Sequence, residues 1–414
     1  MNTRQRTRRG PGSPIVGWLA AGVAVASLCA PQASAFCGMF VAGAGTDLYN
    51  EASQVAIARV GDKSTITMKN DYAGAPSEFA LVVPVPVVLH EEDVRTVKEE
   101  LFTRLDAFTA PRLVEYYEKD PCEQPDRRRY MMKSSAVPMM DMAEGAAPEE
   151  DLGVTVEAKF DVAEYKIVIL SAKESTGLET WLKQNGYSLP EGSAPILAPY
   201  VKSQMKFFAA KVDVKKLKKD AQGKVNLSPL QFSFKAPSFE LPIRLGMVNS
   251  RGLQDLIIFA LAENERVVTT NYPNLFIPTD QELGEKVPGG DFGKYYLKLF
   301  STAQDEAGGA AVLTEYAWNT GSCDPCPTPP LRSDELKELG LERGYGVVTR
   351  MHARYSNKLF KDDLRLGLTA HKRNFQGRYI LRHPWKGPVK CKNPRYGRWG
   401  RPSPQAMTGN LSIR

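Results

Sequence analysis

Cysteine is the residue type in this sequence whose spacing comes closest to a reactive pattern. Cys323 and Cys326 form a Cys-Asp-Pro-Cys motif, the spacing that thiol–disulfide enzymes use. Those enzymes place the pair at a helix N-terminus, where the helix dipole lowers the pKa of the first thiol. Here three prolines follow within the four residues after Cys326, and the next helix signal begins only near Ser333. We therefore favour a structural disulfide, and a thiol–disulfide oxidoreductase using this pair is the alternative.

Three further cysteines are candidates for bridges: Cys37, Cys122 and Cys391. Together with the motif they make five outside the first 35 residues, which we predict below to be cleaved off with Cys29, and an odd number leaves at least one thiol free or bonded between chains. Cys323 and Cys326 could bond to each other, or one of them could bond to Cys391. A bridge between Cys37 and Cys122 would tie down the start of the chain, but the sequence does not fix the connectivity.

Other reactive patterns are missing. The sequence has no G-x-S-x-G elbow, no H-E-x-x-H, no P-loop and no G-x-G-x-x-G. A Cys3His zinc site from Cys323, Cys326, Cys391 and His383 has suitable ligand types, but its residues are widely separated. His352 and His371 fall in or beside predicted strands, where packed or surface side chains are the simpler interpretation. The sequence therefore predicts no catalytic residue, no metal site and no cofactor.

The first 35 residues have the three parts of a secretory signal peptide. Four arginines and no acidic residue precede an apolar run over residues 15–30, which ends in Ala-Ser-Ala at positions 33–35. Sixteen residues are short for a membrane span, which needs about 20. We expect cleavage between Ala35 and Phe36 and a protein that is not transmembrane afterwards. This predicts an exported protein, periplasmic or extracellular.

Apolar periodicity predicts strands in runs and few helices. Predicted helices cover residues 91–106, 176–185, 194–204, 291–304 and 333–339. Predicted strands cover residues 54–59, 64–69, 79–84, 165–170, 207–214, 230–235, 240–247, 256–262, 266–271, 311–318, 347–355, 364–369 and 378–381. The Gly61-Asp62 pair predicts a two-residue hairpin. The strands over residues 230–271 are predicted to form a meander or a series of hairpins. The fold class is α+β with mainly antiparallel sheets and a few packed helices.

Composition divides the chain into five parts: a signal peptide at 1–35, an N-terminal α+β part at 36–122, an insertion at 123–152, the main α+β body at 153–385 and a basic tail at 386–414. The insertion holds five methionines and then acidic residues without apolar periodicity, so we favour a flexible segment over a copper-binding methionine cluster. The tail is rich in Gly and Pro and is predicted to be disordered.

The net charge of +7 is distributed unevenly. The signal peptide carries +4 and the tail +7, which leaves 43 Lys and Arg against 47 Asp and Glu in residues 36–385. The predicted folded body is therefore weakly acidic, which argues against nucleic acid as a partner. The charge pattern allows one partner, an anionic envelope surface, which the basic tail would contact weakly.

Several of these segments resemble one family. The stretches at 50–59, 78–86, 105–112, 323–326 and 374–385 are similar to the bacterial domain of unknown function 2330 family. The resemblance extends from about Phe36 to Trp385 and implies an exported bacterial protein without an assigned reaction. Relatives in that family carry a second Cys soon after the first, whereas here residues 39–42 follow Cys37 and Gly38. The resemblance thus makes Cys122 a partner to consider for Cys37.

The leading functional hypothesis is an exported protein of the bacterial envelope that acts by binding or as a structural component without catalysis. It rests on the signal peptide, the strand-rich pattern and the missing catalytic motifs. A hydrolase acting on envelope polymers is a weaker third candidate, because no pair of carboxylates stands out as acid and base.

Overall fold

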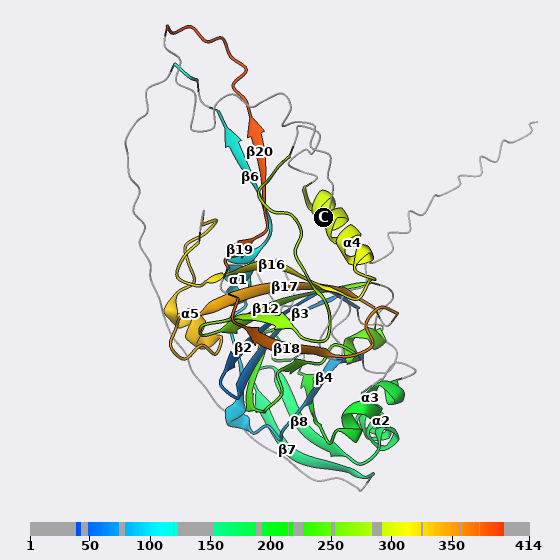
Figure 1. Cartoon of the computed structure of the whole chain (residues 1–414). Coiled ribbons are helices and arrows are strands. Elements are labelled where there is room, and N and C mark those ends of the chain that lie inside the picture. Colours follow the sequence, from blue (N-terminus) through cyan, green and yellow to red (C-terminus); the bar gives the residue numbers. More distant parts are fainter. Residues whose placement is uncertain are drawn as a thin grey trace, which may run out of the picture. The chain divides into compact units, whose positions relative to one another are not determined.

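The two-residue hairpin predicted at Gly61 joins β2 (Tyr49–Val60) to β3 (Lys63–Ala73). Gly61 has a φ of 58°, a left-handed conformation that glycine adopts without strain. The computed structural model of the chain (Figure 1) describes residues 39–42, 49–73, 79–118, 120–122, 152–187, 193–213, 215–217, 227–249, 253–283, 292–323, 326–356, 358–371 and 373–392. These residues all belong to one unit, Ala33–Arg414.

The largest sheet contains nine strands among the described residues. Their order is β14 (Asn274–Leu275), β16 (Val312–Asn319), β17 (Val347–Tyr355), β12 (Gln254–Ala262), β2, β3, β10 (Leu230–Lys235) and β5 (Val94–Thr96), with β19 (Phe375–Gln376) paired to β16. β2 and β12 are parallel neighbours near its centre, and β17 pairs antiparallel with β12.

A second sheet has five strands in the order β1 (Met39–Ala42), β4 (Phe79–Val85), β9 (Lys206–Val212), β8 (Tyr165–Ala172) and β7 (Val154–Val162). All of its neighbouring strands are antiparallel. The strand predicted over 79–84 is β4, and it is buried on both faces, because Leu81 and Val83 face one core and Val82 faces another.

The main core lies between these two sheets. In β8, Ile167 and Ile169 point into it, whereas Val168 and Leu170 point to the opposite face, as the period of two in a strand requires. β2 alternates in the same way, with Ile57 directed into this core. Strands with apolar residues on both faces need a layer on each side, and helices supply the outer layers.

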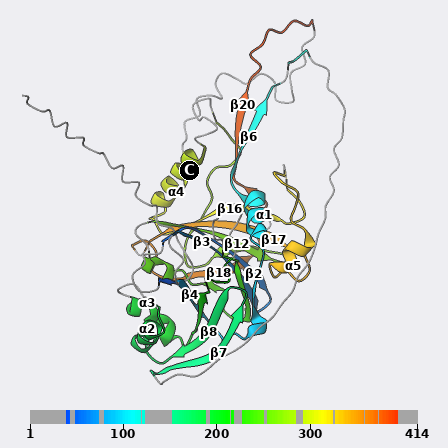
Figure 2. The same ribbon diagram turned by 180° about the vertical axis from the view of Figure 1, so that it is seen from behind.

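Two pairs of helices cover the outer faces. α2 (Ser175–Gln184) and α3 (Ser193–Lys202) pack on the five-stranded sheet, as both Figure 1 and Figure 2 show. α1 (Glu100–Thr109) and α5 (Ser333–Glu338) pack on the nine-stranded sheet, burying Phe102, Leu105 and Leu336 against β2 and β12. α4 (Phe292–Glu306) packs against β16 and β20. No helix within the described ranges is long and apolar enough to cross a bilayer.

Two small sheets complete the fold. One contains β11 (Glu240–Leu241), β18 (Leu364–Thr369) and β13 (Arg266–Thr269), and the other contains β15 (Gln281–Leu283), β20 (Arg378–His383) and β6 (Arg112–Tyr117). Single turns of 3-10 helix, η1 (Glu91–Asp93) and η2 (Leu245–Asn249), connect strands. The class is thus α+β, but the sheets are not purely antiparallel. The nine-stranded sheet is mixed, because β2 runs parallel to β12 and β14 to β16, and in the last small sheet β6 and β15 both run parallel to β20.

Three sequence predictions are wrong in detail. The helix predicted over 91–106 begins only at Glu100, because Val94 pairs with Phe232 and adds β5 to the sheet edge. The strand predicted over 240–247 stops at Leu241, where Pro242 has no backbone donor for the ladder. The strands over 230–271 form no meander, since β10 pairs with β3 and β5 while β12 pairs with β2 and β17.

Candidate functional site

A constellation of charged side chains lies on one face of β17. Arg350, His352 and Arg354 are two residues apart, so a strand directs all three to the same side. On the neighbouring strands, Glu315 of β16 and Asp255 of β12 face them. We call these five residues the charged cluster.

Glu315 is the centre of the charged cluster and is fully buried. Its carboxylate accepts hydrogen bonds from Arg350 Nε at 2.5 Å and from the hydroxyl of Tyr296 on α4 at 2.9 Å, and His352 Nδ1 lies 2.9 Å from its Oε1. Burial alone would raise the pKa of Glu315, but the charges and hydrogen bonds of His352 and Arg350 outweigh burial and lower it to about 2. The carboxylate is therefore held ionised.

His352 lies between two carboxylates. Its Nε2 is 2.9 Å from Asp255 Oδ1, while its Nδ1 contacts Glu315. Burial would lower the pKa of His352, but Glu315 and Asp255 raise it overall, because the protonated ring donates at both nitrogens. Arg354 binds both oxygens of Asp255 at 2.9 Å, and together with His352 it outweighs burial and lowers the pKa of Asp255 to about 2.

The charged cluster leaves no group ready for proton transfer. Arg350 also binds Asp106 of α1, so each charged side chain of the cluster faces an opposite charge at hydrogen-bond distance. A general base needs a lone pair directed at a substrate, and a nucleophile needs a base beside it. Both carboxylates here are already occupied by cations. This arrangement is that of a buried ionic network that joins β12, β16, β17, α1 and α4.

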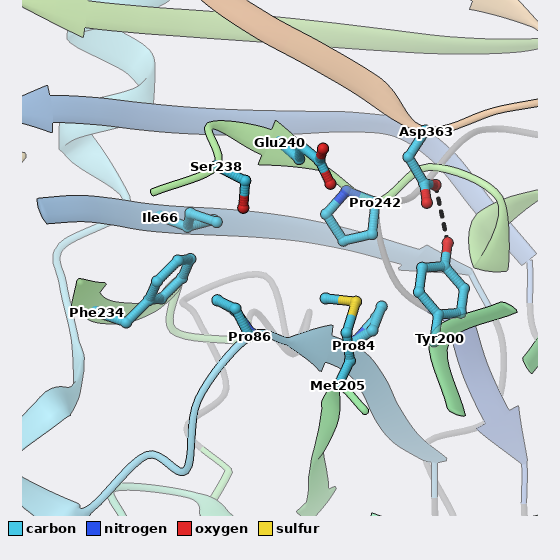
Figure 3. Close-up of a pocket in the computed structure, with 10 residues that line it drawn as sticks. All are labelled: Ile66, Pro84, Pro86, Tyr200, Met205, Phe234, Ser238, Glu240, Pro242 and Asp363. Atoms are coloured by element: carbon cyan, nitrogen blue, oxygen red, sulfur yellow. Dashed lines mark hydrogen bonds between the residues drawn. The ribbon is translucent and has the colours of Figure 1, made fainter. Parts of the chain in front are cut away.

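A small cavity lies where β4 ends (Figure 3). It is lined by Ile66, Pro84, Pro86, Tyr200, Met205, Phe234, Ser238, Glu240, Pro242 and Asp363. Its volume is about 40 Å³, whereas pockets for metabolites hold about 300–1,000 Å³. Because one water needs about 10–15 Å³, the cavity has room for two or three waters. Pro84 and Pro86 belong to the Val-Pro-Val-Pro run of the sequence, which thus forms part of the wall.

Asp363 is the charged residue of this cavity with the most partners. Its Oδ1 accepts from the Tyr200 hydroxyl and from the backbone N–H of Ile243 at 2.8 Å, and Figure 3 shows the hydroxyl pointing at the carboxylate. Its Oδ2 accepts from Arg244 Nη2 at 2.8 Å. Burial, and next the negative charge of Asp363, raise the pKa of Tyr200. Asp363 therefore connects α3 to the segment before η2 and has no capacity left for a substrate.

The described cysteines form two bridges. Cys323 is bonded to Cys326, and Cys122 is bonded to Cys391 across a sequence separation of 269 residues. The alternative pairing of Cys122 with Cys37 is therefore not formed, because parallel pairing of β6 and β20 carries Cys122 and Cys391 to the same end of their sheet. Cys37 and the cleavage site Ala35–Phe36 lie outside the described residues.

The motif cysteines do not occupy the position that redox enzymes use. Cys323 follows β16 on a loop, and the next helix, α5, begins at Ser333. The zinc alternative fails, since both bridges consume its cysteines, and no three metal-ligating side chains gather in the described parts of the chain. His371 contacts Arg266, and His383 contacts Glu115. The methionines of the insertion lie outside the described residues.

The charged cluster and the cavity were not predicted from the sequence. The sequence does contain one sign of the cluster, the charged residues Arg350, His352 and Arg354. They occupy every second position of a predicted strand and must therefore share one face of it. A second sign is Glu315, a carboxylate inside a predicted apolar strand. Their meeting with Asp255 depends on strand order, which the sequence pattern does not contain.

Residues 31–367 match the model of a family described as uncharacterised proteins conserved in bacteria, the domain of unknown function 2330 family. The chain belongs to this family. Comparison with curated proteins finds no match, and comparison with solved structures finds none. The resemblance inferred from the sequence motifs is confirmed, although the family match ends within β18. β20 and the bridge to Cys391 lie beyond it.

Proposed function

We propose that this protein is exported and acts in the bacterial envelope, in the periplasm or outside the cell, by binding or as a structural component. The observation that carries the non-catalytic part is the saturation of the charged cluster. Its ionised carboxylates each hold two cationic side chains, so none is free to act as a base. The cavity of about 40 Å³ supports the same proposal, since it is too small for a metabolite.

Export is supported by the signal peptide pattern and by two disulfides, which persist in oxidising compartments. The test is to express the full chain in a Gram-negative host and sequence the N-terminus of the product in each cell fraction. We expect a periplasmic or secreted product that starts at Phe36. Ala35→Arg should block cleavage, whereas Ala35→Ser keeps a small residue and should be processed. An intact N-terminus in the cytosol would contradict the proposal.

The thiol–disulfide oxidoreductase is tested separately. In an insulin-reduction assay, we expect the exported protein and its Cys323→Ser variant to show the same background rate, because the pair lies on a loop without a helix dipole to lower a thiol pKa. A rate that depends on Cys323 would replace the non-catalytic proposal with the redox one.

A further inference from the structure

The end of the β6/β20 sheet exposes aromatic side chains. Tyr117, the last residue of β6, is 69% exposed, and Trp385, two residues after β20, is 41% exposed. Val389 adds a further exposed apolar side chain at 40%. In both Figure 1 and Figure 2, β6 and β20 lie side by side, and an orange-red segment continues beyond the end of β20. Trp385 and Val389 belong to the residues that follow β20 in the sequence. Exposed aromatics gathered at one end of a sheet indicate a surface for binding.

Tyr117 is held in position by its neighbours. Its ring stacks on His383 with centroids 4.2 Å apart and an interplanar angle of 9°. The Tyr117 hydroxyl donates to Glu115 Oε2 at 2.7 Å, and His383 Nε2 lies 2.7 Å from the same oxygen. One face of the ring is thus covered by His383, and the other is left for a partner.

The segment after β20 is anchored to β6. The backbone N–H of Trp385 donates to Glu118 at 3.3 Å, and Cys391 is bonded to Cys122. A side chain at Gly387 would bring its Cβ within 2.4 Å of the Trp385 indole, so glycine allows the ring to lie against the backbone. These contacts hold Trp385 beside Glu118, directly after β6, and Cys391 beside Cys122.

The same segment is basic. Residues 378–392 include five Lys and Arg and no acidic residue. Arg378 and Arg382 are paired with Asp280 and Glu282. Lys390 and Lys392 flank Cys391 and are exposed, and neither forms an ion pair with a carboxylate in the described part of the chain. We call Tyr117, Trp385, Val389, Lys390 and Lys392 the tip surface.

We propose that the tip surface docks on the headgroup region of an anionic phospholipid bilayer. Tyr and Trp combine an apolar ring with a polar end and suit the boundary between hydrocarbon and headgroups. Each Lys near an anionic surface strengthens binding by roughly fivefold. A glycan would need hydrogen-bond groups around the rings that are open to sugar hydroxyls, whereas Glu115 and His383 beside Tyr117 bind each other, and Glu118 binds the backbone of Trp385. The inference rests on the proposed export, because the bilayer must be reached from outside the cytoplasm.

The test uses the mature chain, residues 36–414, and sedimentation with vesicles of phosphatidylglycerol and phosphatidylcholine. We expect binding to vesicles rich in phosphatidylglycerol, weaker binding at 1 M NaCl and none to pure phosphatidylcholine. Lys390→Gln together with Lys392→Gln should lower the partition coefficient roughly 30-fold. Trp385→Ser should lower it roughly tenfold, because it removes buried apolar area.

Matched controls carry equivalent changes elsewhere. Lys298→Gln with Lys358→Gln removes two exposed lysines, and Tyr345→Ser removes an exposed aromatic, so both should bind as the unchanged chain does. Deleting residues 393–414 separates the tip surface from the remaining tail. Retained binding after this deletion supports the tip surface. Binding lost on deletion but insensitive to Trp385 and the two lysines, or binding to soluble polysaccharide instead of vesicles, would overturn the proposal. N-terminal sequencing tests export independently.

Discussion

Glu315 shows at the residue scale how a carboxylate is kept charged inside a sheet. A bulge between Thr314 and Tyr316 gives Glu315 no opposite residue in β17, so its side chain is directed at both Arg350 and His352. Its backbone carbonyl accepts from Gly377 at 2.8 Å. An isolated buried carboxylate would be protonated, and the cations around Glu315 prevent this.

Replacing this carboxylate should therefore be costly. We predict that Glu315→Gln lowers the free energy of unfolding by about 3–5 kcal/mol, because Arg350 and His352 lose their counter-charge inside the protein. Urea unfolding followed by circular dichroism measures this change. Glu342→Gln is the matched control, since Glu342 forms an exposed ion pair with Lys63 and should change stability by less than about 1 kcal/mol. Equal effects of the two variants would refute the network.

The pH dependence of the same variants follows from the pKa values. Glu315 and Asp255 have pKa values of about 2 in the folded protein, below the value of roughly 4 expected in the unfolded chain. Their contribution to stability is present above about pH 4.5 and is lost as the pH falls toward 2. The unfolding free energy of Glu315→Gln should depend less steeply on pH across this window than that of the unchanged chain.

Gly346 matters at the element scale, where β12 and β17 meet. A side chain at Gly346 would place its Cβ 2.4 Å from the backbone oxygen of Ala262, the last residue of β12. Thr320 binds both backbone groups of Gly346, which fixes the loop after β16 against the start of β17. The close approach of two backbones is possible because glycine has no side chain.

We predict opposite signs for two glycine substitutions. Gly346→Ala should lower the unfolding free energy by about 1–3 kcal/mol, because the added methyl group pushes β17 away from β12. Gly293→Ala has no atom within 4 Å of the new Cβ and lies in α4, so it should raise stability by about 0.5 kcal/mol. Thermal unfolding of both variants decides between these signs. A neutral Gly346→Ala would show that the strands can separate there without cost.

The bridge between Cys122 and Cys391 acts at the scale of the whole molecule. It joins the segments that follow β6 and β20. Cys122 and Cys391 are 269 residues apart in sequence, with a Cα–Cα distance of 5.6 Å. Closing a long loop removes more conformational freedom from the unfolded chain than closing a short one. The second bridge spans only three residues, Cys323 to Cys326.

The two bridges should therefore differ in their effect on stability. We predict that Cys122→Ser with Cys391→Ser lowers the free energy of unfolding by about 2–5 kcal/mol, and that Cys323→Ser with Cys326→Ser lowers it by about 2 kcal/mol or less. Urea unfolding under oxidising conditions compares the pairs. A larger loss from the second pair would assign the main stabilising role to the motif bridge.

The sequence by itself determined the local elements and the class. Short apolar runs identified β8, β9, β12 and β17, and the Gly61-Asp62 pair located the hairpin, because these signals depend on neighbouring residues. It also identified the family through its motifs and gave the uneven distribution of charge. Short patterns led to wrong predictions. The apolar spacing around Val94 predicted a helix, whereas Val94 lies in a strand that pairs with β10.

Only the tertiary structure decided which distant residues meet. Glu315 and His352 are 37 residues apart and Asp255 is 97 residues from His352, and strand order alone brings them within 2.9 Å. The choice of Cys391 as the partner of Cys122 likewise follows from the parallel register of β6 and β20. The periodicity that identifies a strand depends on the residues next to it along the chain and not on the strand it pairs with, so local pattern carries no record of such pairings.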